Sequence, residues 1–247
     1  MKIKLLIILM FAVFASLTSC KKAPLSIGKI VTETRELSDF KEVYLNNDIS
    51  LTLVRSDTCY ITITTGENII GNITTEINNE VLTISNTSTL NWIRTYDFEL
   101  HATLYYKDIR NFTFSSSGTL DTRNQYNDTI GSYKFTIDGG SGDIDVSIKH
   151  CKDLYIKYKY GTSRMNLHGR GNGYLKITKR SYGILDARNL EMQSVDVDNM
   201  SPGDCYIWAT QSINAEIYSL GDIYYRGNPS TINCKYGEIA RGKLLPL

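Results

Sequence analysis

The 247-residue sequence has few of the features that mark helical, disulfide-rich or nucleic-acid-binding proteins. It contains four prolines, five cysteines and three histidines, and its formal net charge is +1. This charge gives no electrostatic basis for binding nucleic acid. The cysteines are too sparse for a disulfide scaffold and lack the close pairing of a zinc site. No P-loop, Gly-x-Ser-x-Gly or His-Glu-x-x-His pattern occurs. We therefore predict no cofactor, no metal and no enzymatic activity.

The only apolar run of the sequence that is long enough for a signal peptide lies at the start of the chain. Two lysines precede an almost unbroken apolar run over residues 5–17, which suits a signal peptide and is shorter than the roughly 20 residues of a membrane span. The run ends in Leu17-Thr18-Ser19-Cys20, which resembles the lipobox of bacterial lipoproteins. We predict a signal peptide over residues 1–19 and a lipidated Cys20 with its tether over residues 20–30. The mature protein is then attached by lipid to the outer membrane, on its periplasmic or its outer side.

Helical periodicity is nearly absent from the rest of the chain, and alternation of apolar and polar residues replaces it. The alternating segments include residues 49–53, 60–64, 81–84, 112–114 and 213–217. Isoleucine, threonine, tyrosine and valine dominate these segments, which is typical of β-strands. The sequence therefore predicts an all-β protein. Within it, Cys205 and Cys234 lie in strand-like runs, so we expect buried free thiols there; a disulfide is the alternative.

A glycine followed by a short strand recurs through the second half of the chain. These glycines are Gly118, Gly142, Gly161, Gly183, Gly203, Gly221 and Gly237, separated by 24, 19, 22, 20, 18 and 16 residues. A glycine at each repeat indicates a positive φ or a tight corner. A period near twenty with two strands per repeat favours a β-helix, or solenoid, in which each turn stacks about 4.8 Å from the next. Six intervals then span about 29 Å.

The inward-facing side chains of one such turn can be assigned from the alternation. Ile144, Val146 and Ile148 should point into the core, while Asp143 and Asp145 point outward. We assign the solenoid repeats to residues 111–247 and a cap or first turns to residues 31–110, which lack the glycine series. An antiparallel β-sandwich is the alternative fold, because its turns recur every 8–12 residues or so.

Two sets of outward residues are candidate functional sites. Tyr155, Lys157 and Lys159 should share one strand face, where aromatic and basic groups could contact a glycan or a protein. The second set is an acidic column, because an acid directly follows four of the glycines: Asp143, Asp204, Asp222 and Glu238. Calcium binding and a catalytic Asp143–Asp145 pair are conceivable there, but aspartates that form turns are the simpler interpretation.

Several phrases of the sequence, in order, resemble the bacterial family described as putative auto-transporter adhesin, head GIN domain. These phrases are residues 35–45, 75–84, 140–144 (Gly-Ser-Gly-Asp-Ile) and 225–229 (Tyr-Arg-Gly-Asn-Pro). The resemblance covers roughly residues 30–240, although only one repeat keeps the double-glycine form. It implies a right-handed β-helical head in an envelope lipoprotein. We therefore expect an adhesin-like protein that binds an envelope or host glycan or a protein partner. The alternatives are an envelope scaffold and a polysaccharide-active enzyme.

Overall fold

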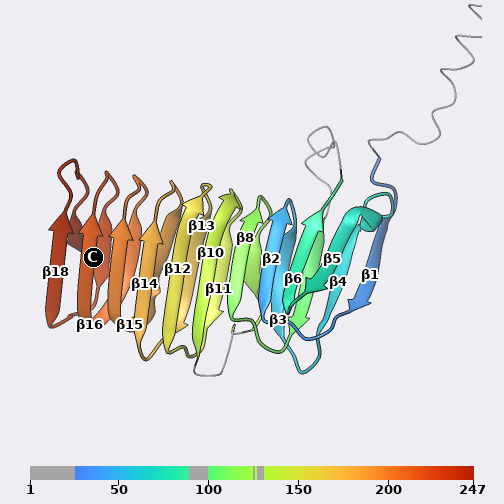
Figure 1. Ribbon diagram of the computed structural model, residues 1–247, viewed down its shortest axis with the longest axis horizontal. Helices are drawn as coiled ribbons and strands as arrows, with labels where there is room; N and C mark the ends of the chain where they lie inside the picture. Colours follow the sequence, from blue (N-terminus) through green and yellow to red (C-terminus); the bar gives the residue numbers. More distant parts are fainter. Residues whose placement is uncertain (1–25, 89–99, 125, 127–130) are drawn as a thin grey trace, which may run out of the picture.

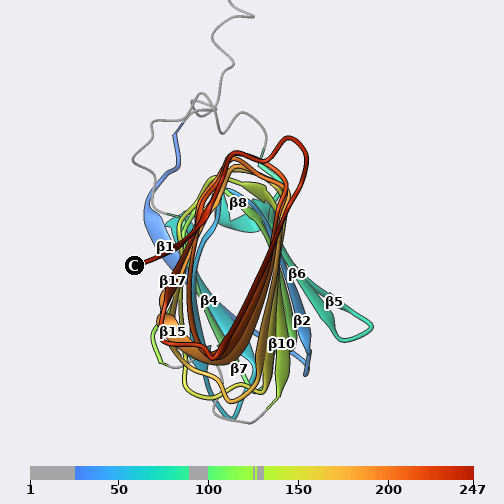
Figure 2. The same cartoon turned by 90° about the vertical axis from the view of Figure 1, so that its left-hand side faces the viewer.

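The computed structural model describes residues 26–88, 100–124, 126 and 131–247. The expected signal peptide and Cys20 lie outside these residues. The chain is 63% strand and forms a β-solenoid of about six turns, which confirms the predicted fold class. Each turn is flattened, with one strand in a front sheet and one in a back sheet (Figures 1 and 2). No helix of the described residues is long and apolar enough to cross a membrane.

The front sheet faces the viewer in Figure 1 and is built from strands and strand halves of successive turns. In spatial order they are β5 (Ile73–Asn78), β6 (Val81–Asn86), β2 (Glu42–Asn47), β8 (Asn111–Ser116), β10 (Ser132–Gly140), β12 (Asp153–Tyr160), β14 (Tyr174–Lys179), the second halves of β15 (Ile184–Asn199) and β16 (Cys205–Ile217), and β18 (Thr231–Tyr236).

The back sheet is built in the same way. Its order is β1 (Ile30–Glu36), β4 (Tyr60–Gly66), β7 (His101–Tyr106), β3 (Ser50–Arg55), β9 (Leu120–Thr122), β11 (Ile144–Ile148), β13 (Arg164–Arg170), the first halves of β15 and β16, β17 (Ile223–Arg226) and β19 (Leu244–Pro246). Because β15 and β16 each run through both sheets, one continuous strand bends around the second corner of a turn.

Parallel pairing between turns decides against the antiparallel sandwich. Among the described residues, every strand pair from β8 onward is parallel, and side chains of equivalent positions stack in rows. One inward row runs through Phe112, Phe135, Ile156, Ile177, Val197, Ala215 and Cys234. The expected inward residues Ile144, Val146 and Ile148 are at most 1% exposed, whereas Asp143 and Asp145 are exposed. Stacked apolar rows of this kind provide the burial that no single turn could achieve alone.

The N-terminal turns are not stacked in sequence order. The turn β2–β3 lies between β6–β7 on one side and β8–β9 on the other, and all of these contacts are parallel. The antiparallel pairs β1–β4, β4–β7 and β5–β6 lie at that end of the molecule. The β5–β6 hairpin turns at Asn79 and Glu80, both with positive φ, as in a two-residue hairpin loop. The short 3₁₀ segment η1 (Ile70–Asn72) completes this cap.

Close stacking at the first corner of each turn explains most of the recurring glycines. A Cβ atom on Gly142 would collide with the carbonyl oxygen of Gly118, and one on Gly203 would collide with that of Gly183. Of the seven predicted glycines, Gly161 alone has a positive φ. The tight corner, which was the other expectation, applies at Gly118, Gly142, Gly183, Gly203 and Gly221. The backbones of adjacent turns approach too closely at this corner for a side chain.

The predicted glycine register needs two corrections. Gly161 stacks on Gly139 and Gly140, so Ser163 occupies the position equivalent to Gly142 in its turn. In the last turn Gly237 contacts the Tyr218 ring, and Gly242 stacks on Gly221 instead. Sequence spacing alone could not detect these shifts, because β-bulges and longer corners change the number of residues per turn.

Candidate binding surfaces

The predicted front-sheet site lies together on β12. Tyr155, Lys157 and Lys159 alternate with buried residues, and Tyr155 is 39% exposed. The register places Lys176 of β14 directly beside Tyr155. The ring of Tyr174 meets that of Tyr155 edge-on, with their centroids 6.4 Å apart. The aromatic and basic side chains expected on one face are therefore neighbours on the outer surface of the front sheet.

Acidic residues on neighbouring strands offset the positive charge of this site. The Lys159 Nζ lies 3.1 Å from the Asp138 carboxylate. Asp198 and Glu216 occupy the same outward row as Lys157. Burial raises the pKa of Asp198, as does the nearby Glu216 carboxylate, and Arg180 and Lys176 oppose the shift. The front sheet thus presents a mixed charge pattern rather than a site specific for anions.

The expected acidic column is broken. Asp204 and Asp222 occupy one row, which continues back through Ile184 and Arg164 to Asp143. In the last turn Lys243, not Glu238, follows the stacked glycine. No group of three or more His, Cys, Asp or Glu residues within the described part of the chain could hold a metal ion.

Asp204 and Asp222 join successive turns through their side chains. An Oδ1 of Asp204 accepts a hydrogen bond from the backbone N–H of Asp222 at 3.0 Å. An Oδ1 of Asp222 accepts one from the N–H of Lys243 at 2.7 Å. Each carboxylate therefore satisfies a corner amide of the following turn, which is a structural use of these aspartates.

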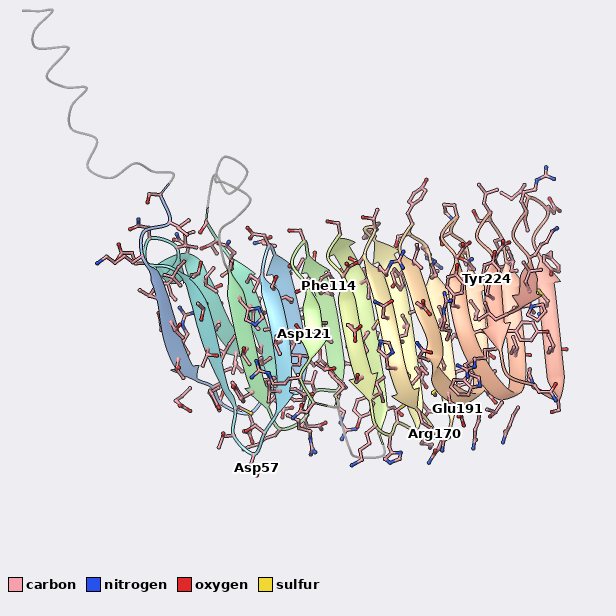
Figure 3. All side chains as sticks on the ribbon, turned by 180° about the vertical axis from the view of Figure 1, so that it is seen from behind. Asp57, Phe114, Asp121, Arg170, Glu191 and Tyr224 are labelled. Atoms are coloured by element: carbon pink, nitrogen blue, oxygen red, sulfur yellow. The ribbon has the colours of Figure 1, made fainter. Side chains whose placement is uncertain are left out.

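The two aspartates considered as a catalytic pair lie in different settings. Asp143 is in the first corner, and Asp145 is on the outer face of β11, where its carboxylate lies 3.3 Å from His168 Nε2. Asp145 also sits next to Asp121 in the back sheet, whose position Figure 3 labels. Both residues of the pair are exposed.

An exposed apolar surface at the first corner was not predicted from the sequence. The corner segments between front and back strands, at the top of Figure 1, carry six of the exposed large apolar side chains. We call this set the corner ridge: Tyr160, Tyr182, Met200, Tyr218, Leu220 and Ile239. Four of these side chains are 62–80% exposed, and Met200 and Tyr218 are 39% exposed. These residues come from separate corners, and only the stacking of the turns brings them to one edge.

Buried polar groups fix the corners beneath the ridge. The Nζ of Lys179 points inward and donates hydrogen bonds to the carbonyl oxygens of Gly203 and Asp204 at 2.7 and 2.8 Å. In the next turn the Nδ2 of Asn199 donates to the carbonyl oxygen of Gly221 at 3.0 Å. Burial lowers the pKa of Lys179 to about 8. These bonds pair corner carbonyls that face the core and hold the backbone under the ridge in place.

The back sheet carries a half-buried ladder of aromatic and arginine side chains. The rings of Tyr206 and Tyr224 stack at 5.0 Å, and the Arg188 guanidinium lies 4.1 Å from the Tyr206 ring. Tyr224 is labelled in Figure 3. Arg188 also pairs with Asp186 at 2.8 Å, and this contact raises the pKa of the arginine. Because its members already bind one another, this ladder offers less free surface than the corner ridge.

The described cysteines are all free. Cys59, Cys151 and Cys205 are buried, and burial raises the pKa of the Cys151 and Cys205 thiols to about 12. Cys205 therefore agrees with the expected buried thiol. Cys234 is only half-buried, because it belongs to the last front strand, which has a neighbour on one side.

The stacked turns and glycine corners agree with a known family. The model of the family described as putative auto-transporter adhesin, head GIN domain, matches residues 39–229. The chain belongs to this family. The family description is that of a putative adhesin, and it suggests a protein of the cell envelope or surface.

Solved structures share the fold of this GIN-domain chain. A putative adhesin from Bacteroides fragilis is 18% identical, with a TM-score of 0.76 over 89% of this chain and 97% of the other. A putative lipid binding protein from Parabacteroides distasonis is 19% identical, with a TM-score of 0.63 over 89% and 97%. A putative adhesin from the same species is 15% identical, with a TM-score of 0.59 over 89% and 98%. No functionally curated protein matches the sequence.

Proposed function

We propose that the protein is a lipid-anchored envelope protein whose β-helical head binds a glycan through the corner ridge. The observation that carries this proposal is the concentration of exposed tyrosines and aliphatic side chains along one edge of the solenoid. Contiguous apolar surface exposed to water commonly marks an interaction site. Tyrosine combines a flat apolar ring with a hydroxyl group, which suits a sugar that has C–H bonds on one face and hydroxyls at its rim.

The geometry of the ridge suits an extended ligand. Its residues come from successive turns, which repeat at about 4.8 Å along the solenoid axis. Tyr160, Tyr182 and Leu220 belong to three different turns, so a polymer lying along the axis can contact all three. The front-sheet residues Tyr155, Lys157 and Lys159 lie on the strand that leads to Tyr160 and extend the same surface.

Binding of a protein partner is the second candidate. Met200, Leu220 and Ile239 add aliphatic surface that a sugar does not require, and aliphatic side chains are common at the centres of protein interfaces. A purely structural role in the envelope is what remains if neither ligand is found.

A glycan array tests the proposal with matched variants. The triple variant Tyr160→Ser, Tyr182→Ser, Leu220→Ser removes the most exposed part of the ridge that lies within the stacked turns. The control variant is Tyr44→Ser. The wild-type Tyr44 side chain is 40% exposed and lies on β2, away from the ridge. We expect binding to weaken at least about tenfold in the triple variant and to stay within about twofold in the control. Equal binding by both variants would refute the role of the ridge, and protein capture without any glycan signal would favour the second candidate.

The lipid anchor is tested separately. Cys20→Ala should abolish incorporation of labelled palmitate and release the protein from the membrane fraction, because one thiol carries the predicted lipid. Proteolysis of intact cells then distinguishes the outer face from the periplasmic face. Palmitate labelling that persists in the Cys20→Ala variant would contradict the anchor.

A further inference from the structure

The last front strand leaves the core open. In β18 the inward positions are Ile232, Cys234 and Tyr236, which continue the rows of Ile213, Ala215 and Ile217. The three residues of the preceding turn are at most 2% exposed, whereas Ile232 is 43% and Tyr236 is 56% exposed. Side chains at core positions are therefore exposed at this end of the solenoid, which faces the viewer in Figure 2.

The backbone of β18 also has an unpaired edge among the described strands. β18 pairs with β16 in parallel register, and the N–H of Gly237 donates to the carbonyl oxygen of Ile217 at 2.8 Å. Because alternate residues of a strand bond to opposite sides, the N–H and C=O groups of Ile232, Cys234 and Tyr236 face away from β16. The strand carries no proline or inward-pointing charge, which are the usual devices that block edge pairing.

The back-sheet edge of the same turn is closed to a similar contact. In β19 the N–H of Leu247 donates to the carbonyl oxygen of Tyr225 in β17. The backbone groups of Leu244 and Pro246 therefore face the other edge, away from β17. Pro246 has no N–H group to offer. The N–H of Leu244 faces the phenol of Tyr236, which crosses the open core from β18. Pairing at this end is thus restricted to β18.

We propose that two copies of the protein pair end to end through antiparallel β18 strands related by a twofold axis. An axis through Cys234 places Cys234 opposite its counterpart and Ile232 opposite Tyr236 of the second copy. This register uses the outward N–H and C=O groups of all three residues in both chains. On the outer face it sets Asn233 opposite Lys235, so no like charges oppose each other.

A second copy fits this edge better than an unrelated strand. The twofold arrangement satisfies both edges at once and brings the two open core ends together, so that Ile232 and Tyr236 of each chain become buried. The contact lies at the end of the solenoid, away from the side of the turns that carries the corner ridge. Glycan binding and pairing are therefore separable, and either can fail without the other.

Crosslinking through Cys234 gives a direct test with the full-length chain. Hydrogen-bonded antiparallel partners have Cα atoms about 5.5 Å apart, and their Cβ atoms lie further apart than the roughly 3.5–4.5 Å of a disulfide. A short bismaleimide spans this gap between the two thiols. Each thiol adds its S–H bond across the C=C bond of one maleimide ring, so two thioethers form without an oxidant or a leaving group. We expect a covalent dimer in the wild type and in Cys151→Ser, and no such dimer in Cys234→Ser. A covalent dimer that survives Cys234→Ser, or none in the wild type, would overturn the proposal.

Association is measured without crosslinker by native mass spectrometry and sedimentation velocity. Asn233→Lys places a second positive charge opposite Lys235 of the other copy, and its side chain points outward, so the fold should be preserved. We expect dissociation to monomers in this variant and in Ile232→Asp, with Tyr182→Ser as the dimeric control. A wild type that remains monomeric at about 100 µM, or dimers unaffected by Asn233→Lys, would also overturn the proposal. Circular dichroism verifies that each variant is folded.

Discussion

The two ends of the solenoid are built on different plans. At the N-terminal end β1, β4, β5 and η1 cover the core with antiparallel pairs, and the turn β2–β3 is enclosed by turns on both sides. At the C-terminal end each turn stacks on the one before it, and within the described part of the chain β18 has a strand on one side only. A stacked array can open from an uncovered end, whereas an enclosed turn cannot open alone.

The largest expected effect separates the enclosed turn from the last turns. Leu51 of β3 is fully buried between Ala102 and Leu120. Leu51→Ala should destabilise the whole chain by about 4 kcal/mol, because the cavity lies where the N-terminal cap meets the stacked turns. Ile223→Ala in β17 should reduce protection only in the last turns. Hydrogen exchange resolved by strand measures both, and uniform loss of protection in Ile223→Ala would contradict the difference between the ends.

The next effect concerns the corner glycines. Gly142→Ala should cost about 3 kcal/mol, because the added methyl collides with the backbone of Gly118 in the turn below. Gly71 in η1 of the N-terminal cap has open space around it, so Gly71→Ala should change the stability by less than about 0.5 kcal/mol. Urea denaturation of both variants provides the measurement. Equal losses of stability in Gly142→Ala and Gly71→Ala would show that the corner stacking is not tight.

A pH-dependent effect comes from Lys179, which is fully buried in the C-terminal part. Its pKa is about 8 in the folded chain and 10.5 without burial. Below pH 8 both states are protonated and the cost of burying the charge is fully present. Above pH 8 the folded chain releases the proton first, so the stability contributed by this residue rises until about pH 10.5. Between pH 7 and 9.5 the gain is about 2 kcal/mol.

The comparison with Lys179→Met isolates this contribution. The thiol of Cys151, with a pKa raised to about 12, lowers the stability above pH 9 in both proteins and cancels in the difference. The Cys205 thiol interacts with Lys179, so both proteins carry Cys205→Ala in this comparison. The wild-type stability minus that of Lys179→Met, from urea denaturation at each pH, should therefore increase with pH. A constant difference would mean that the amine titrates normally.

The smallest expected effect tests the carboxylates that link turns. Asp204→Ala removes the acceptor for the N–H of Asp222 and should cost about 1 kcal/mol. Asp143 is exposed and has no equivalent acid in the neighbouring turn, so Asp143→Ala should stay within about 0.5 kcal/mol. Thermal unfolding monitored by circular dichroism is sufficient. A larger loss for Asp143→Ala would reverse the assigned roles.

Alternation and glycine spacing were sufficient to predict the fold of the C-terminal part. Ile144, Val146 and Ile148 are buried as expected because local alternation fixes which side of a strand faces the core. The order of the N-terminal turns could not be predicted, because β2 pairs with β6 and β8, at sequence separations that no local pattern encodes. Two glycines were assigned to the wrong position because corner length varies between turns.

The surface was harder to predict than the core. Tyr155, Lys157 and Lys159 share a strand, so alternation alone placed them on one face. Whether their charges are compensated depends on Asp138 and on strands further along the axis, which requires the register. The corner ridge joins single residues from separate turns, and Tyr182 and Leu220 are 38 residues apart in the sequence. The repeat of the glycines could be recognised in the sequence. Which residues of each repeat form the exposed corner could not.

The placement of β2–β3 between later turns also constrains the order of folding. An exported chain emerges from the membrane starting at its N-terminal part, yet β2 acquires its second neighbour only when β8 has emerged, because Asn111, the partner of Glu42 in the register, lies 69 positions later. Contacts that close such long loops form slowly. The N-terminal end of the solenoid is thus expected to form late and as one step, once residue 122 has emerged. The remaining turns can then add to it one at a time as more of the chain emerges.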